Sequence, residues 1–224
     1  MCIRDRSYKW HDLPPGSGLL DLELGRESEL THYDWITDTT VHDGSAWAYM
    51  KNSKYKTTTD LVHYLIDNVS KNGYMLLNIG PKPDGTIPEE DKNLLEGIGN
   101  WLDVNGEAIF ETETWDQYGE GPTKMNEAGP FSDNRAKLIY TAKDFRFTTK
   151  DNFLYATALG WPSKDFTIES IYKLFDNEIE RVELLGSTDK VEWKHTRDGL
   201  HITRPDNKPC EHAYSFKITR KEYL

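Results

Sequence analysis

The chain has 224 residues, enough for one large domain or two ordinary domains of roughly 100–200 residues each. Its 37% hydrophobic and 12% aromatic content is too high for a disordered chain, and its 29% charged content is too high for a membrane protein. A net charge of -11 and the lack of an apolar run near the ~18 residues that cross a bilayer lead us to expect neither nucleic-acid nor membrane partners.

The N-terminus and the cysteines add little to the fold. Residues 1–6 lack the apolar segment of a signal peptide and resemble a translated cloning linker, so we leave them out of the fold prediction. Cys2 and Cys210 are too few for a disulfide scaffold, and we expect Cys210 to be a buried structural thiol. Neither they nor the seven histidines have the spacing of metal ligands, so we predict no metal and no cofactor.

A short strand is predicted over residues 19–24. Leucines there alternate with two acidic residues, Asp21 and Glu23, so one face of the strand is apolar and the other carries two carboxylates. Gly25 follows and ends the strand.

The next segments follow the order of an α/β repeat. Residues 57–72 have helical periodicity behind threonine N-caps, and Gly73 stands where a left-handed C-cap is expected. The nearly continuous apolar run 74–80 predicts a strand buried on both faces, and an acidic first turn with an apolar stripe predicts a second helix over 89–105. Helix, buried strand and helix imply a parallel sheet, in a barrel or a doubly wound fold.

Neither fold fits into the first 118 residues. A (β/α)8 barrel takes ~250 residues, so we expect residues 1–118 to hold only the C-terminal part of a larger α/β domain. Beyond them the sequence changes to short β-rich runs separated by turns, which predicts an antiparallel β-sandwich over residues 119–224. The eight runs are 137–141, 145–148, 153–159, 166–171, 179–185, 191–195, 200–203 and 213–218.

Several stretches read together resemble a known enzyme family. They are the helix and strand over 65–81 with the following DGTIP of 84–88, the IGNWLDVNGEAIF of 98–110, the ELGR of 23–26 and the WITDTT of 35–40. In this order they resemble glycoside hydrolase family 29, the α-L-fucosidases. The resemblance implies an incomplete (β/α)8-type barrel, its C-terminal part, followed by a β-sandwich domain.

The resemblance also implies an activity and a setting. We expect a fragment of a retaining exo-α-L-fucosidase that removes terminal L-fucose from fucosylated glycans by double displacement. By family resemblance the protein is secreted, periplasmic or lysosomal, with a signal peptide that is not in this chain. The sequence leaves the oligomeric state undetermined.

Glu23 is the candidate catalytic residue. Retaining hydrolysis uses two carboxyl groups about 5–5.5 Å apart, one as nucleophile and one as acid and then base. In (β/α) barrels such groups lie at the carboxyl ends of strands, and Glu23 stands near such an end, just before Gly25. The resemblance assigns the acid/base to the Glu of this segment. Another sugar contact, or a structural carboxylate paired with Lys9 or Arg26, are the alternatives.

The second carboxyl group is expected elsewhere. The family nucleophile is an Asp at the end of an earlier strand, and no residue before Glu23 has the matching surroundings. Asp21 is a physical rival, but side chains at i and i+2 of a strand run parallel and should not converge on one sugar carbon. We therefore expect the nucleophile to lie upstream and the chain to be inactive as this fragment.

Two tryptophans are candidate substrate-binding residues. Trp35 and Trp47 lie in polar, loop-like sequence, where an exposed indole offers a flat face for stacking on a sugar. Core packing is the alternative for each. Asp38 and Thr39 are expected to hold their loop through side-chain hydrogen bonds, and Asn78 is expected to anchor a loop rather than touch substrate.

A second functional hypothesis belongs to a different class. The aromatic loops also permit a noncatalytic carbohydrate-binding or scaffolding module. The barrel segments are those of a catalytic domain, so we favour the enzyme fragment.

Overall fold

The computed structural model describes residues 7–9, 13–14, 16–44, 46–134 and 137–221. The chain forms two compact units, one of Met1–Gly99 with Lys124–Leu138 and one of Asn100–Thr123 with Ile139–Leu224. The predicted boundary between two domains, at residues 118 and 119, stays a prediction. Cys2 lies outside the described residues.

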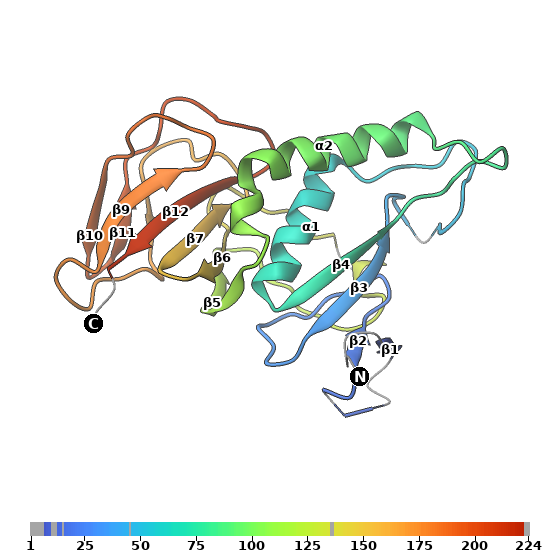
Figure 1. The fold of residues 1–224 in the computed structure, drawn as a ribbon, viewed down its shortest axis with the longest axis horizontal. Helices are drawn as coiled ribbons and strands as arrows, with labels where there is room; N and C mark the ends of the chain where they lie inside the picture. Colours follow the sequence, from blue (N-terminus) through green and yellow to red (C-terminus); the bar gives the residue numbers. More distant parts are fainter. Residues whose placement is uncertain (1–6, 10–12, 15, 45, 135–136, 222–224) are drawn as a thin grey trace. The chain divides into compact units, whose positions relative to one another are not determined.

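The first unit contains a four-stranded parallel sheet (Figure 1). Its order follows the sequence: β1 (Ser7–Lys9), β2 (Leu19–Asp21), β3 (Trp35–Thr40) and β4 (Gly73–Asn78). Helix α1 (Thr58–Ser70) connects β3 to β4, and helix α2 (Glu89–Asn105) follows β4. Both helices and the strand between them confirm the α/β part of the fold prediction; α2 has the predicted bounds, and those of α1 and β4 differ by one or two residues.

Local signals set the start of α1. The Thr57 side chain accepts a hydrogen bond from the Asp60 backbone N–H, and the Asp60 carboxylate accepts one from the Thr57 N–H, which completes a capping box. At the other end the predicted cap is wrong by one residue, because Asn72 and not Gly73 takes the left-handed conformation, with φ 71°.

Gly73 is needed for a different reason. A Cβ at this position would lie 2.4 Å from carbons of the Trp35 indole, so only glycine allows the ring to lie against the start of β4. Trp35 is fully buried and packs with Leu20 and Leu22 in a small core cluster.

The two faces of the sheet differ. Residues paired across β3 and β4 share a face, so Trp35 and Thr37 point to one side, where the Thr37 hydroxyl lies 2.9 Å from the Tyr64 hydroxyl of α1. Tyr74 and Leu76 point to the other side and are 47% and 58% exposed. The prediction that β4 is buried on both faces is therefore wrong, because α1 covers one face only.

A buried ionic cluster ties α1 to the loop after β2. The Asp67 carboxylate, fully buried on α1, lies 2.9 Å from Lys71 Nζ and 3.4 Å from Arg26 Nη1. Arg26 Nε also contacts Asp133 at 3.1 Å, and its guanidinium lies 4.3 Å from the centre of the Tyr64 ring. Because burial strips these charges of water, each depends on the others for stabilisation.

The second unit is a sandwich of two antiparallel sheets, with a common core drawn from both. Seven of the eight predicted runs contain strands, whereas 137–141 does not, and the strand over 113–120 was not predicted. The sheets have the orders β5-β6-β7-β12-β9 and β10-β11-β8. Their strands are β5 (Glu113–Glu120), β6 (Phe145–Lys150), β7 (Phe153–Ala158), β8 (Phe166–Ile168), β9 (Ile179–Leu184), β10 (Trp193–Thr196), β11 (Gly199–Ile202) and β12 (Tyr214–Arg220).

Short helical turns and the C-terminal end of α2 complete the units. The 3₁₀ turns are Gly106–Ala108 in the second unit and Ser132–Asn134 in the first. Trp101 of α2 is buried, and its indole N–H donates to the Ala213 carbonyl at 2.9 Å. Cys210 is half-buried, and burial raises the pKa of its thiol, which fits the predicted structural role.

The Asp67 cluster gives the first testable expectation. Asp67→Asn removes the negative charge that lies between Arg26 and Lys71 and should lower the free energy of unfolding by about 3–5 kcal/mol. Glu96→Gln makes the same acid-to-amide change at an exposed position of α2 and should stay within about 0.5 kcal/mol of wild type. Urea denaturation measures both, and equal effects would contradict a stabilising role for the cluster.

The Trp35–Gly73 contact gives the second expectation. Gly73→Ala forces a methyl group into the indole and should destabilise the chain by about 1–3 kcal/mol. Gly99→Ala is the matched control, since a Cβ there meets nothing within 4 Å and alanine favours a helix by about 0.5–1 kcal/mol. The melting temperature should therefore fall for Gly73→Ala and rise for Gly99→Ala. A higher melting temperature for Gly73→Ala would show that the contact between position 73 and the indole is not tight.

Candidate functional site

The loop that carries Glu23 begins where β2 ends. β2 stops at Asp21, and the chain turns through Leu24, which has a positive φ of 46°. Leu22 and Leu24 nevertheless keep donating backbone hydrogen bonds to Ile36 and Asp38 of β3. Glu23 therefore stands beside the middle of β3 with a half-buried side chain, on a turn rather than in a regular strand.

A returning segment of the same unit fixes this turn. The Phe131 N–H donates to the Glu23 carbonyl at 2.7 Å, and the Asp133 N–H donates to the Leu24 carbonyl at 3.1 Å. Gly25 is required here, because a Cβ would lie 2.1 Å from the Gly129 carbonyl oxygen. Glu23 is thus held by backbone hydrogen bonds on both sides of the turn.

Three carboxylates surround one ammonium group. Lys9 Nζ lies 3.2 Å from an oxygen of Asp21, 3.2 Å from an oxygen of Glu23 and 3.2 Å from an oxygen of Asp38. Lys9 pairs with Asp21 across β1 and β2, so their side chains share a face. Asp38 lies two residues after Ile36, the partner of Asp21 on β3, and therefore points to that same face, opposite α1.

The expectation that Asp21 and Glu23 do not converge on one sugar carbon stays a prediction. Both carboxylates contact Lys9 Nζ, so their oxygens lie within two salt-bridge lengths of each other. Glu23 lies on the turn after Asp21, outside the regular strand.

The neighbours of the Asp21 carboxyl alter its acidity. Burial, together with a hydrogen bond and like charge from Asp38, raises the pKa of Asp21 to about 6, although Lys9 acts in the opposite direction. Asp21 Oδ1 is buried and has no hydrogen-bond partner of good geometry among the described residues. With this pKa the Asp21 carboxyl exchanges its proton closer to neutral pH than an ordinary aspartate does.

The two tryptophans differ in exposure. Trp35 has no accessible surface, and its indole N–H donates to the Lys71 carbonyl at 3.1 Å, so it has the core position that was the alternative for it and offers no face to a sugar. Trp47 is half-buried, and its carbonyl accepts a hydrogen bond from Asn78 Nδ2 at 2.9 Å. This bond confirms Asn78 as a loop anchor.

Asp38 and Thr39 of β3, for which the sequence predicts one shared role, have different partners. The Asp38 carboxylate contacts Lys9, whereas the Thr39 hydroxyl accepts a hydrogen bond from Lys56 Nζ at 3.1 Å. Thr39 is thus tied to the chain that follows β3, and Asp38 to the end of β1. The sequence indicates Lys9 only as a possible partner of Glu23. Its position among three carboxylates depends on the parallel pairing of β1 with β2, which the sequence does not show.

Metal and membrane features are limited to two findings. Within the described ranges, no group of three or more His, Cys, Asp or Glu side chains is arranged to hold a metal ion. No helix in the part of the chain that the structure describes is long and apolar enough to span a bilayer.

Comparisons with known proteins identify the family. A family model described as Alpha-L-fucosidase matches residues 4–107, and one described as Alpha-L-fucosidase C-terminal domain matches residues 137–219. The chain belongs to the α-L-fucosidase family. The site around Glu23 lies in the segment matched by the first of these models.

Individual relatives show how much of such a protein the chain represents. It is 31% identical over 198 residues to plasma alpha-L-fucosidase of Pongo abelii, with 85% of this chain and 38% of the relative covered. It is 29% identical over 203 residues to tissue alpha-L-fucosidase of Rattus norvegicus, with 87% of this chain and 39% of the relative covered. The chain therefore spans well under half the length of these fucosidases.

A solved fucosidase structure is covered to a similar extent. The crystal structure of Thermotoga maritima alpha-fucosidase in complex with fucose is similar with a TM-score of 0.68 and 26% identity. The match covers 93% of this chain and 43% of that fucosidase. The fold is accordingly that of the C-terminal part of a catalytic barrel followed by the fucosidase C-terminal domain.

The carboxylate group gives a pH expectation. The folded state holds the Asp21 proton more tightly than the unfolded chain, since the pKa of this carboxyl rises from 3.8 to about 6. Its contribution to stability should therefore fall as pH rises through this range. Carbon-13 NMR of the Asp21 carboxyl should show titration near pH 6.

Two variants separate the causes of this shift. Asp38→Asn removes a like charge and should lower the pKa of Asp21, whereas Lys9→Met removes the cation and should raise it. If neither variant moved the titration, burial alone would account for the shift and the three charged groups would not act together.

Proposed function

We propose that this chain is part of a retaining exo-acting α-L-fucosidase that removes terminal L-fucose from glycans. The observation that carries the proposal is the position of Glu23, held by backbone hydrogen bonds beside the parallel sheet, in the segment similar to the fucosidase family. The fucose bound to the Thermotoga maritima relative supports the choice of sugar.

Glu23 is the proposed acid and base. As a carboxylic acid it protonates the leaving oxygen, and as a carboxylate it then removes a proton from the water that attacks the fucosyl-enzyme intermediate. Lys9 Nζ, 3.2 Å away, stabilises the carboxylate that remains after the first step. Asp21, with a pKa of about 6, is placed on the same ammonium group and can exchange a proton within the cluster.

The nucleophile is proposed to be an Asp in the part of the relatives that this chain does not span. The coverage of 38% and 39% of the two relatives leaves ample length for it. Asp21 remains the rival for this role because it lies near Glu23 in space. Trp47, which retains exposed surface, is the remaining aromatic candidate for contact with substrate, whereas buried Trp35 supports the sheet beneath the site.

The setting of the complete protein is proposed from the same relatives. A plasma and a tissue fucosidase are among them, which favours a secreted or lysosomal protein over a cytosolic one. A periplasmic location is the corresponding proposal for a bacterial source.

The experiment compares substrates in the complete enzyme that contains this chain. A sugar leaving group needs protonation and an activated phenolate does not, so Glu23→Ala should reduce kcat/KM on a natural fucosyl glycan about 10²–10⁴-fold more than on an aryl fucoside. Azide should partly restore turnover of the aryl fucoside, because a small anion can attack the intermediate without a base.

Matched variants test the roles of Glu23 and Asp21 separately. Glu29→Gln, at an exposed position of the same loop, should leave both substrates unaffected. If Asp21 were the nucleophile, Asp21→Asn would abolish turnover of both substrates and residues 1–224 alone would be active; we expect the isolated chain to be inactive. A complete parent protein without fucosidase activity would instead favour a noncatalytic carbohydrate-binding module.

A further inference from the structure

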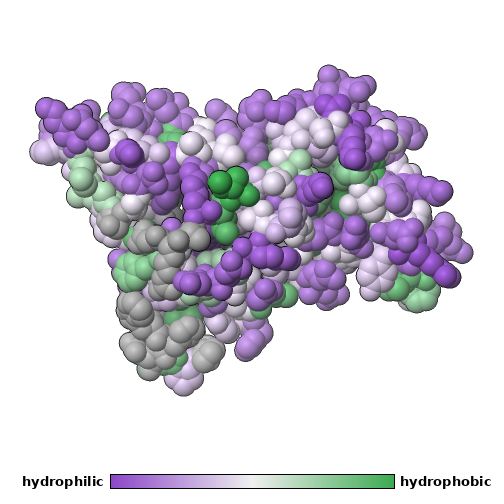
Figure 2. Space-filling model, turned by 180° about the vertical axis from the view of Figure 1, so that it is seen from behind, coloured by the Kyte–Doolittle hydropathy of each residue, from purple (hydrophilic) through white to green (hydrophobic). Residues whose placement is uncertain are grey.

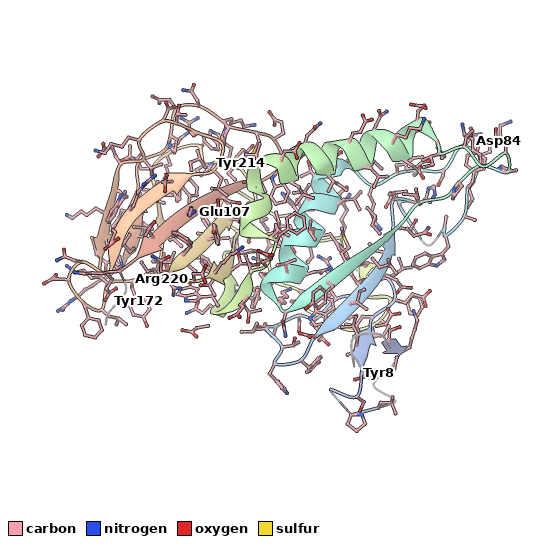
Figure 3. All side chains as sticks on the ribbon, in the orientation of Figure 1. Tyr8, Asp84, Glu107, Tyr172, Tyr214 and Arg220 are labelled. Atoms are coloured by element: carbon pink, nitrogen blue, oxygen red, sulfur yellow. The ribbon has the colours of Figure 1, made fainter. Side chains whose placement is uncertain are left out.

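The second unit contains a cavity that the fucosidase site does not use. Its volume is about 620 Å³, within the roughly 300–1,000 Å³ of small-molecule sites. The lining comes from strands of the five-stranded sheet, from β10 and from the segment 170–178 that precedes β9. Figure 3 labels two of its residues, Tyr172 and Arg220, at the same end of this unit.

Aromatic and aliphatic side chains form the apolar part of the cavity. Tyr172, Leu174 and Phe175 line it and are 48%, 68% and 66% exposed, an unusual concentration for one short segment. Figure 2 shows apolar surface at the edge of this unit, among mostly hydrophilic atoms. Trp115 lies deeper and is fixed by an edge contact with Phe147, with ring centres 5.1 Å apart.

One residue of the lining, His195, has a ring nitrogen without a hydrogen-bond partner among the described residues. Nε2 of His195 is buried and makes no hydrogen bond of good geometry with any of them. Burial lowers the pKa of this histidine more than the charge of Glu178 and backbone hydrogen bonds with Ile171 and Tyr172 raise it, so the site favours the neutral ring. A neutral imidazole nitrogen left unpaired costs free energy, and a hydroxyl group satisfies it in either tautomer because it both donates and accepts.

The charged residues of the lining favour an uncharged ligand. Three carboxylates, Asp116, Asp151 and Glu178, stand with two cations, Arg220 and Lys221. This mixture attracts neither a strong anion nor a strong cation. Carboxylates and guanidinium groups can instead accept from and donate to several hydroxyls of one ligand.

We propose that this cavity is a carbohydrate-binding site for a neutral mono- or disaccharide unit of a glycan. The aromatic side chains pack on the C–H face of a sugar ring, and His195 and the charged residues bind its hydroxyls. An apolar peptide would fill the aromatic rim but would leave His195 Nε2 unpaired. The site gives the β-sandwich a role in holding a glycan, independent of the chemistry at Glu23.

The test uses the 224-residue chain and sugars without fucose. Lactose and N-acetyllactosamine are the probes, with sialyllactose as the anionic comparison, and binding is followed by saturation-transfer NMR and by titration of tryptophan fluorescence. Tyr172→Ala and Phe175→Ala each remove an exposed ring and should weaken binding of the neutral sugars about tenfold. Nitrogen-15 NMR should show the His195 Nε2 resonance shifting on saturation.

Phe110→Ala is the control for loss of an exposed ring. Phe110 is 57% exposed in the same unit and does not line the cavity, so this variant should bind like wild type. Melting temperatures establish that each variant is folded. The proposal is overturned if neither neutral sugar binds the wild-type chain at millimolar concentration, if sialyllactose binds as well as lactose, or if all three variants bind equally.

Discussion

The buried charge of Asp67 is the constraint on which the first unit depends. This carboxylate compensates Lys71 at the end of α1 and Arg26 in the loop after β2, and Arg26 in turn contacts Asp133. Segments far apart in the sequence are therefore fixed to one helix by charges that water does not reach. The loop that carries Glu23 is one of these segments, so the position of the proposed acid/base follows from an ionic cluster on the opposite side of the sheet.

The elements set by local signals could be predicted. The capping box at Thr57 and the apolar spacing within each helix involve residues that are only a few positions apart in the sequence. Both α1 and α2 are found within two residues of the expected bounds. Features that depend on distant partners could not. The requirement for Gly73 comes from the Trp35 ring, and β5 is an irregular strand whose pairing with β6 is interrupted between Thr114 and Gly119.

The candidate site shows the same division. Glu23 is recognisable from its place near a strand end and from the family resemblance. Lys9 and Asp38 join it only through the parallel register of three strands, and a sequence gives no direct sign of that register. Trp35 is ambiguous in the sequence because the residues around it are polar, yet their side chains alternate across the sheet and leave the indole on the covered face.

Strand β4 has a consequence for the behaviour of the chain in solution. It is the last strand in the order of the parallel sheet, so one row of its backbone N–H and C=O groups has no strand beside it among the described residues. Its sequence, Gly-Tyr-Met-Leu-Leu-Asn, has neither a charge nor a proline to discourage pairing with a second copy, and Tyr74 and Leu76 add exposed apolar surface. An uncharged edge of this kind is a template for intermolecular strand addition, and a lysine at position 76 would be the smallest change that interrupts it.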